Sequence, residues 1–118
     1  MSLIYLSHSV KDYNTAYETI LEDKVKEMFL GCNIINPKNV VVQPEDRIQL
    51  SGTYNGYIIM MKKYYYPIID TVNTLVAAKS YNINRNKYSH GVQLEMEYAK
   101  LTGKPIYELS FEELGITK

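Results

Sequence analysis

The chain has 118 residues, of which 13 are basic and 13 acidic, so its formal net charge is zero. This length suits one compact domain, and we expect a single domain over residues 1–118. The basic residues are dispersed along the chain, which argues against a nucleic-acid-binding surface. No apolar run approaches the length of a membrane span. We therefore expect neither a nucleic acid nor a membrane as a partner.

The cysteine content and the first residues indicate the compartment. Cys32 is the only cysteine, so no internal disulfide can form. Residues 1–5 lack the basic flank and the long apolar region of a signal peptide. These features favour a reducing, cytoplasmic location.

No pattern in the sequence predicts a metal or a cofactor. Both histidines are isolated, and no cluster of Cys, His or Asp has the spacing of metal ligands. The glycine-rich loops that hold nucleotide phosphates in other folds are also missing. We expect no cofactor and no bound metal.

The first third of the chain predicts a strand, a helix and a second strand. Residues 3–7 alternate and are rich in strand formers, and a polar loop follows. Asn14 or Thr15 can cap a helix that runs to about residue 30. Residues 32–36 form the second predicted strand. In the helix we expect an apolar face that includes Ala16, Ile20, Leu21, Val25, Met28 and Phe29, and a solvent face that includes Glu18, Glu22, Lys24 and Lys26.

The middle of the chain gives weaker signals. Residues 40–42 suit either a short edge strand or a loop, and residues 44–46 can open a short helix. Gly52, Asn55 and Gly56 are typical of a mobile stretch that covers a site. A helix is predicted over 56–65, with a break, kink or new turn at Pro67.

The last part of the chain predicts a strand over 74–78, a polar loop over 79–88, a helix that begins after Ser89, and a strand over 106–109. Residues 111–118 are consistent with a final helical turn. Alternating strands and helices predict an α/β fold: a single three-layer, doubly wound domain, flavodoxin- or Rossmann-like, with a parallel sheet of four to five strands.

Three loops should meet at one edge of this sheet. Ligands of such folds bind at the carboxyl ends of the strands, where the strand order reverses. The loops over 7–12, 36–39 and 79–91 all follow predicted strands. We expect the ligand to lie among them.

The predicted helix after Ser89 carries the clearest chemical signal. At 100° per residue, Gln93, Glu97 and Lys100 fall on one polar arc, whereas Glu95 falls on the apolar arc with Ala99. A carboxylate directed at the interior costs free energy unless it is paired, hydrogen-bonded or protonated. Glu95 therefore belongs either to a buried pair or to a site of chemistry.

Three segments resemble the nucleoside 2-deoxyribosyltransferase-like superfamily, which includes the 2-deoxyribosyltransferases and the 2'-deoxynucleoside 5'-monophosphate N-glycosidases. The segments are Ile-Tyr-Leu-Ser at 4–7, Asn-Thr-Leu-Val-Ala at 73–77, and Gly-Val-Gln-Leu-Glu-Met-Glu-Tyr-Ala at 91–99. By this resemblance Glu95 takes the place of the nucleophile and Tyr5 that of a tyrosine near the sugar. The resemblance further implies cleavage or transfer at the N-glycosidic bond of a nucleoside or its 5'-monophosphate, and a homodimer or larger homo-oligomer.

The sequence departs from the family at the acid that assists the leaving base. The family carries an aspartate about eleven residues before the strand at 73–77, which here lands near Lys62. Asp70 and His8 are the candidates to supply a proton, and we include Asp70 among the catalytic residues. The helix glycines of the family are replaced by Gln93 and Glu97.

Five further residues are expected to bind the ligand. They follow predicted strands or begin the predicted helix, whose free N–H groups suit an anion such as a 5'-phosphate. They are Ser7, His8, Asn36, Ser89 and Gly91.

Two other interpretations remain open. The first is a nucleotide-binding sensor of the same fold without catalysis, which the lysine near the expected acid position favours. The second is a macromolecular interaction protein that uses a tyrosine-rich surface, since the chain has 12 tyrosines.

Overall fold

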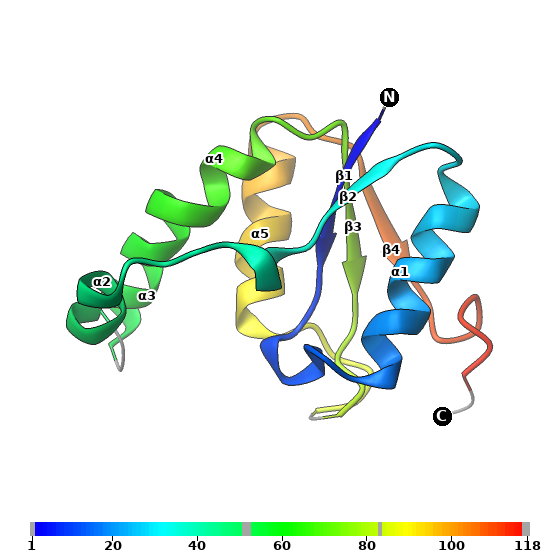
Figure 1. Cartoon of the computed structure of the whole chain (residues 1–118), viewed down its shortest axis with the longest axis horizontal. Coiled ribbons are helices and arrows are strands. Elements are labelled where there is room, and N and C mark those ends of the chain that lie inside the picture. The colour runs from blue at the N-terminus through cyan, green and yellow to red at the C-terminus, as the bar shows by residue number, and fades with distance from the viewer. Residues whose placement is uncertain (1, 51–52, 83, 117–118) are drawn as a thin grey trace.

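A computed structural model describes residues 2–50, 53–82 and 84–116 of the chain. Its four strands form one parallel sheet in the order β2-β1-β3-β4. The strands are β1 (Leu3–Ser7), β2 (Asn33–Ile35), β3 (Thr74–Ala78) and β4 (Ile106–Leu109). Helices cover both faces of the sheet (Figure 1), so the fold is the predicted three-layer α/β arrangement.

One face of the sheet packs on α1 (Ala16–Met28). Alternate strand residues such as Ile4, Leu6 and Val76 join Leu21 and Val25 of the helix in one apolar cluster. Thr15 caps the helix by accepting a hydrogen bond from the N–H of residue 18. Because side chains alternate along a strand, this face takes the even-numbered residues of β1 and leaves the odd-numbered ones to the other layer.

The other face packs on α4 (Tyr66–Ile69) and α5 (His90–Leu101). Tyr5, Leu75 and Ala77 of the strands join Val92 and Ala99 of α5 in a second apolar cluster. Ser89 caps α5 by accepting from the N–H of Val92. Since α5 runs opposite to the strands, its first turns lie near the carboxyl ends of β1 and β3, where Figure 1 shows the loops after these strands.

The segment before α4 is helical but irregular. It consists of α2 (Pro44–Leu50), α3 (Tyr54–Met60) and a π-helix over Met61–Tyr65 that leads directly into α4. In Figure 1, α2 and α3 lie beyond α5, on the side away from α1. Single-turn π segments within helices are frequent at functional sites.

The element predictions held best where the apolar pattern was strong. The strands over 74–78 and 106–109 and the helix after Ser89 are confirmed. Residues 40–42 form no strand, and Pro67 lies in the first turn of α4, directly after the π-helix, so it does not end the helical segment. Residues 111–115 form turns, and residues 117–118 lie outside the described part of the chain.

The predicted faces of α1 were partly wrong. Tyr17 and Glu18 are buried, whereas Ala16 and Ile20 are exposed. The apolar stripe at Tyr17, Leu21 and Val25 is narrow, and a network of polar partners allows Glu18 to be buried beside it.

Candidate active site

Glu95 is buried on α5 and is held by two hydroxyl groups of β1. The side chain is 5% exposed, and Ser7 donates a hydrogen bond of 2.7 Å to its Oε1 atom. Tyr5, which is fully buried, donates to Oε2. Both carboxyl oxygens are therefore fixed in position, which is what a directed nucleophile requires. The structure thus brings together Glu95 and Tyr5, which were expected to be catalytic, and Ser7, which was expected to bind the ligand.

Opposing effects set the protonation of Glu95. Burial raises the pKa of its carboxyl group from 4.5 to about 7, against the hydrogen bonds from Ser7 and Tyr5, which favour the ionised form. The carboxyl group is therefore partly ionised at neutral pH. Strongly shifted carboxyl groups in a hollow of the surface are typical of active sites.

Glu95 lines a cavity of about 210 Å³ beside the carboxyl ends of the strands. The walls come from the loop after β1, from the start of α5 and from the segment that includes α2, α3 and the π-helix. This volume is below the usual range of small-molecule sites, about 300–1,000 Å³, so it suits part of a ligand rather than the whole. The lining residues are His8, Val10, Tyr13, Arg47, Tyr57, Met60, Met61, Tyr65, Ser89, Gly91, Val92 and Glu95.

Three tyrosines surround the carboxylate within this cavity. Burial and, next, the charge of Glu95 raise the pKa values of Tyr13, Tyr57 and Tyr65, that of Tyr57 to about 12. All three hydroxyl groups thus stay protonated at neutral pH and can donate hydrogen bonds. No pattern in the sequence singled out these residues or Arg47. Gly52, Asn55 and Gly56 had predicted a mobile stretch that covers a site, and Gly52 lies outside the described residues.

His8 forms part of the cavity wall, but both of its ring nitrogens are engaged elsewhere. Nδ1 lies 2.9 Å from the carbonyl oxygen of Leu6, and Nε2 lies 2.7 Å from a carboxylate oxygen of Glu18. Both ring nitrogens of His8 therefore already have a polar partner within the protein. His8 therefore has no ring nitrogen left to bind a ligand, and the expectation that it does so is not supported by its position.

Glu18 is the centre of a buried polar network beside the cavity. Burial alone would raise the pKa of this carboxyl group, but hydrogen bonds from Lys38, from His8, from the N–H of Asn14 and from the side chain of Asn36 lower it to about 2. The Nζ atom of Lys38 is 2.6 Å from Oε1. The spacing Thr15-x-x-Glu18 is that of a capping box, and this signal could have indicated that Glu18 turns back towards the helix start.

Asn36 supports this network instead of facing the cavity. Its side-chain amide donates to Glu18 and Glu22, and its side-chain oxygen accepts from the N–H of Lys38. The prediction that it binds ligand is therefore not supported by its position, because its polar atoms are already used.

Ser89 and Gly91 line the cavity as predicted. Ser89 holds the first turn of α5, and Gly91 lies against the hydroxyl group of Tyr57. A Cβ atom at Gly91 would collide with that oxygen. The glycine thus allows the α3 side chain to approach the start of α5.

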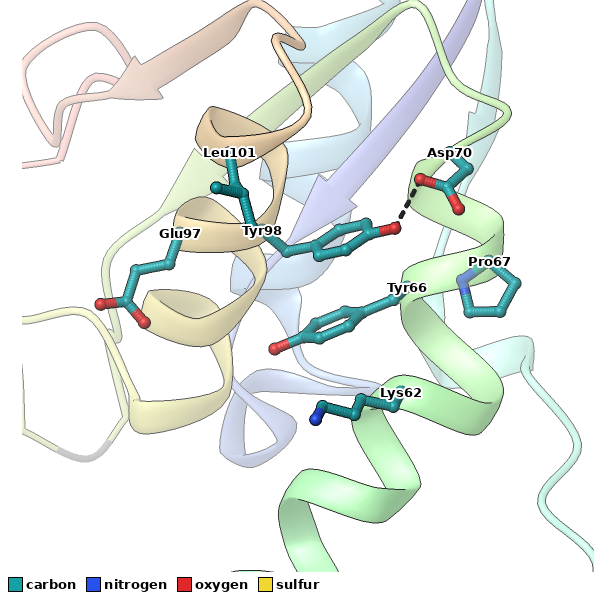
Figure 2. A pocket seen from close by; sticks show the side chains of 7 residues that line it. All are labelled: Lys62, Tyr66, Pro67, Asp70, Glu97, Tyr98 and Leu101. Atoms are coloured by element: carbon teal, nitrogen blue, oxygen red, sulfur yellow. Dashed lines mark hydrogen bonds between the residues drawn. The ribbon is translucent and has the colours of Figure 1, made fainter.

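Asp70 lies away from Glu95. It follows α4 and precedes β3, so it is at the amino end of the strand and not at the carboxyl end. It accepts a hydrogen bond of 2.7 Å from Tyr98. The ring of Tyr98 stacks on that of Tyr66, and both rings line a surface groove (Figure 2). The expectation that Asp70 is catalytic is corrected by this placement, because the residues around the Glu95 cavity do not include it.

Across residues 2–50, 53–82 and 84–116, His, Cys, Asp and Glu side chains form no group suited to hold a metal ion. No helix in the part of the chain that the structure describes is long and apolar enough to cross a membrane.

Comparison with known proteins identifies the fold. No protein-family model matches the sequence, and no curated protein matches it. The structure is similar to that of a 2-desoxiribosyltransferase from Leishmania mexicana, with a TM-score of 0.57 and 15% sequence identity over 100% of this chain and 74% of the other. The chain thus has a nucleoside 2-deoxyribosyltransferase-like fold. Within it, Glu95 of α5 accepts hydrogen bonds from two hydroxyl groups of β1.

Proposed function

We propose that this protein cleaves or transfers at the N-glycosidic bond of a (deoxy)nucleoside or its 5'-monophosphate, with Glu95 as the nucleophile. The observation that carries the proposal is the buried Glu95 carboxylate, held at both oxygens by Tyr5 and Ser7 at the edge of a cavity. The fold, which it shares with a 2-desoxiribosyltransferase, agrees with this chemistry.

In the first step, an oxygen of Glu95 bonds to the anomeric carbon of the sugar while the bond to the base breaks. The electron pair of that bond leaves with the base, which takes up a proton. The transition state has oxocarbenium character, so a close carboxylate stabilises it. Water or a second base then attacks the same carbon and releases the carboxylate.

The leaving base needs a hydrogen bond or proton. Within the described residues around the cavity, the hydroxyl groups of Tyr13, Tyr57 and Tyr65 and the guanidinium of Arg47 are the available donors. None is as strong an acid as a carboxylic group, so we expect good leaving bases to be favoured over poor ones.

A catalytically inactive nucleotide sensor is the second candidate. It is favoured by one observation: Glu95 is the single carboxylate among the described residues that line the cavity. A sensor would bind nucleotides without releasing the base.

The test incubates the protein with deoxynucleosides and their 5'-monophosphates and follows free base by chromatography. We expect release by the wild type and at least a 10³-fold lower rate with Glu95→Gln. Glu97→Gln, on the exposed face of the same helix, is the matched control and should retain the rate. Nucleotide-dependent thermal stabilisation without release would favour the sensor. The absence of both release and stabilisation would reject the enzyme and the sensor alike.

We also propose a cytoplasmic homodimer or larger homo-oligomer. Ile59 and Leu101 are 50% and 84% exposed, and Leu101 borders the groove of Figure 2 with the stacked Tyr66 and Tyr98. Contact with a second copy would remove such apolar surface from water. Light scattering that gives only the monomer mass at high micromolar concentration would reject the oligomer.

A further inference from the structure

Arg47 of α2 carries the one permanent positive charge among the described residues that line the Glu95 cavity. The residue is exposed, so it lies where the cavity opens to solvent. Among residues 2–50, 53–82 and 84–116, no carboxylate forms an ion pair with its guanidinium group. A guanidinium group has five N–H donors in one plane and no acceptor. This planar set of donors is therefore open to a ligand.

The residue before Arg47 fixes α2 to the π-helix. Asp46 accepts a hydrogen bond of 2.7 Å from the Nζ atom of Lys63 and a second one from the hydroxyl group of Tyr64. That hydroxyl group in turn accepts a hydrogen bond of 3.2 Å from the N–H of Gln43, directly before α2. These contacts do not use Arg47, so the backbone that carries its guanidinium group is positioned before any ligand binds, which lowers the entropic cost of binding.

Arg47 and Glu95 act on the same hydroxyl group of the cavity. Burial and the charge of Glu95 raise the pKa of Tyr65, and the charge of Arg47 opposes them. Both charges therefore lie near the Tyr65 hydroxyl group. A ligand whose sugar meets Glu95 can thus present another of its parts to Arg47.

Most of the other side chains that line the cavity are aromatic or apolar. Aromatic rings stack on the flat face of any base, whatever its identity. These walls can therefore bind the face of a base, whereas a polar group is needed to distinguish its edge. The aromatic and apolar side chains include those of Tyr13, Tyr57, Met60, Met61, Tyr65 and Val92.

The donors of Arg47 suit the edge of one class of purine. Guanine and hypoxanthine carry two neighbouring acceptors, O6 and N7, and an arginine side chain can donate to both at once. Adenine also has N7, but its amino group at C6 would direct N–H groups at the N–H groups of Arg47. Because donors left without an acceptor cost free energy, the guanidinium group disfavours adenine as well as favouring a 6-oxopurine.

We propose that Arg47 recognises the edge of the leaving base and makes this protein select 6-oxopurine nucleosides, whose base is guanine or hypoxanthine, over adenine nucleosides. This inference rests on the proposed function, because the sugar of the same ligand meets Glu95. Two N–H groups of Arg47 donate to O6 and N7 while the electron pair of the broken glycosidic bond spreads into the rings of the base. The guanidinium group keeps its protons, and water protonates the released base. Arg47 is thus a specificity-determining residue.

The binding test uses Glu95→Gln protein, which does not consume the ligand, and isothermal calorimetry. The ligands are deoxyguanosine, deoxyinosine, deoxyadenosine and 7-deazadeoxyguanosine, each also as its 5'-monophosphate. Within each series we expect the guanine and hypoxanthine compounds to bind at least tenfold more tightly than the adenine compound. The 7-deaza compound, which lacks the N7 acceptor, should lose most of this advantage.

Substitutions at Arg47 in this background should change the preference in two different ways. Arg47→Met removes the donors and should abolish it. Arg47→Gln should reverse it, because the glutamine amide accepts from the amino group of adenine and donates to N7. Arg85→Met, at the other arginine of the chain, which is exposed and outside the cavity, is the matched control and should keep the preference.

Three results would overturn the inference. The first is equal affinity for the guanine and adenine compounds, and the second is a preference that survives Arg47→Met. The third is Arg47-dependent binding of deoxycytidine as tight as that of deoxyguanosine, since O2 and N3 of cytosine are also neighbouring acceptors.

Base release by the protein with native Glu95 then separates this inference from the proposed function. Release of adenine as fast as of guanine would keep the function and reject the role of Arg47. Arg47-dependent binding of the 6-oxopurine compounds without release from any substrate would keep that role and reject the glycosidic chemistry.

Discussion

Tyr5 of β1 donates its hydroxyl proton to Oε2 of Glu95 on α5, across ninety positions of sequence. The contact links the central part of the sheet to the helix that carries the carboxylate. Burial and the neighbouring Glu95 charge raise the pKa of Tyr5, so its proton remains in place throughout the pH range in which the carboxyl group titrates. Tyr5 therefore acts as a constant donor that favours the ionised form of Glu95.

Removal of this donor should shift the pH dependence of base release. The nucleophile must be ionised, so the rate of the wild type should rise with a midpoint near pH 7, the pKa of Glu95. Tyr5→Phe removes a hydrogen bond that lowers this pKa. We expect the midpoint to move up by about one pH unit and the rate at pH 7 to fall about fivefold, because the ionised fraction falls from about one half to about one tenth.

The control for this shift is Asp70→Asn. Asp70 accepts a hydrogen bond from Tyr98 near the amino ends of the strands, away from Glu95. Its neutral variant should therefore keep the wild-type midpoint of the pH profile. A Tyr5→Phe profile that coincides with that of the wild type would show that the Tyr5 hydroxyl group does not influence the ionisation of the nucleophile.

The same carboxyl group should reduce stability at high pH. The pKa of Glu95 is raised from 4.5 to about 7 in the folded chain, so the favourable contribution of its neutral form is complete below pH 4.5 and is lost as the pH rises through 7. The shift corresponds to about 3 kcal/mol. Glu95→Gln should therefore unfold at a higher urea concentration than the wild type at pH 8 and at nearly the same concentration at pH 4.5. An equal difference at both pH values would contradict the shift.

Glu18 should have the opposite effect. Its pKa is lowered to about 2, so its contribution to stability is present above pH 4.5 and is lost as the pH falls through 2. Glu18→Gln leaves the Lys38 ammonium without its counter-charge and weakens the hydrogen-bond partner of His8. We expect a loss of about 3 kcal/mol in the free energy of unfolding at pH 7, measured by urea denaturation. Glu27→Gln, on the exposed side of α1, should cost less than 1 kcal/mol.

A methyl group at Gly91 should disturb the cavity wall through one atom. The new Cβ atom would collide with the hydroxyl oxygen of Tyr57, while the ring carbon behind that oxygen is 3.7 Å away, an ordinary contact. Gly91→Ala should therefore displace Tyr57 and lower kcat/KM by about tenfold. Because Tyr57→Phe removes the colliding oxygen, the double variant Gly91→Ala/Tyr57→Phe should be more active than Gly91→Ala alone. Additive losses in this cycle would rule out the collision as the cause.

The sequence alone predicted the layers of the fold and the identity of the central carboxylate. The strand over 74–78 is short and uniformly apolar, and the helix after Ser89 places Glu95 and Glu97 on opposite faces. Both signals are local patterns, a short apolar run in the strand and a periodic spacing of side chains in the helix. Periodicity thus selected Glu95 before its contacts were known, whereas Tyr5 was selected by the resemblance of residues 4–7 to the nucleoside 2-deoxyribosyltransferase-like superfamily.

The rest of the site depended on the tertiary structure, because its contacts join segments with no shared local pattern. Glu18 was predicted to face water, and only the approach of His8 and Lys38 makes its burial favourable. Asp70 is close to β3 in sequence, but it precedes the amino end of that strand, whereas the cavity lies beside the carboxyl ends of the strands. Asp12 likewise fixes the loop after β1 to the loop after β3, and such long-range hydrogen bonds leave no periodic signal in the sequence.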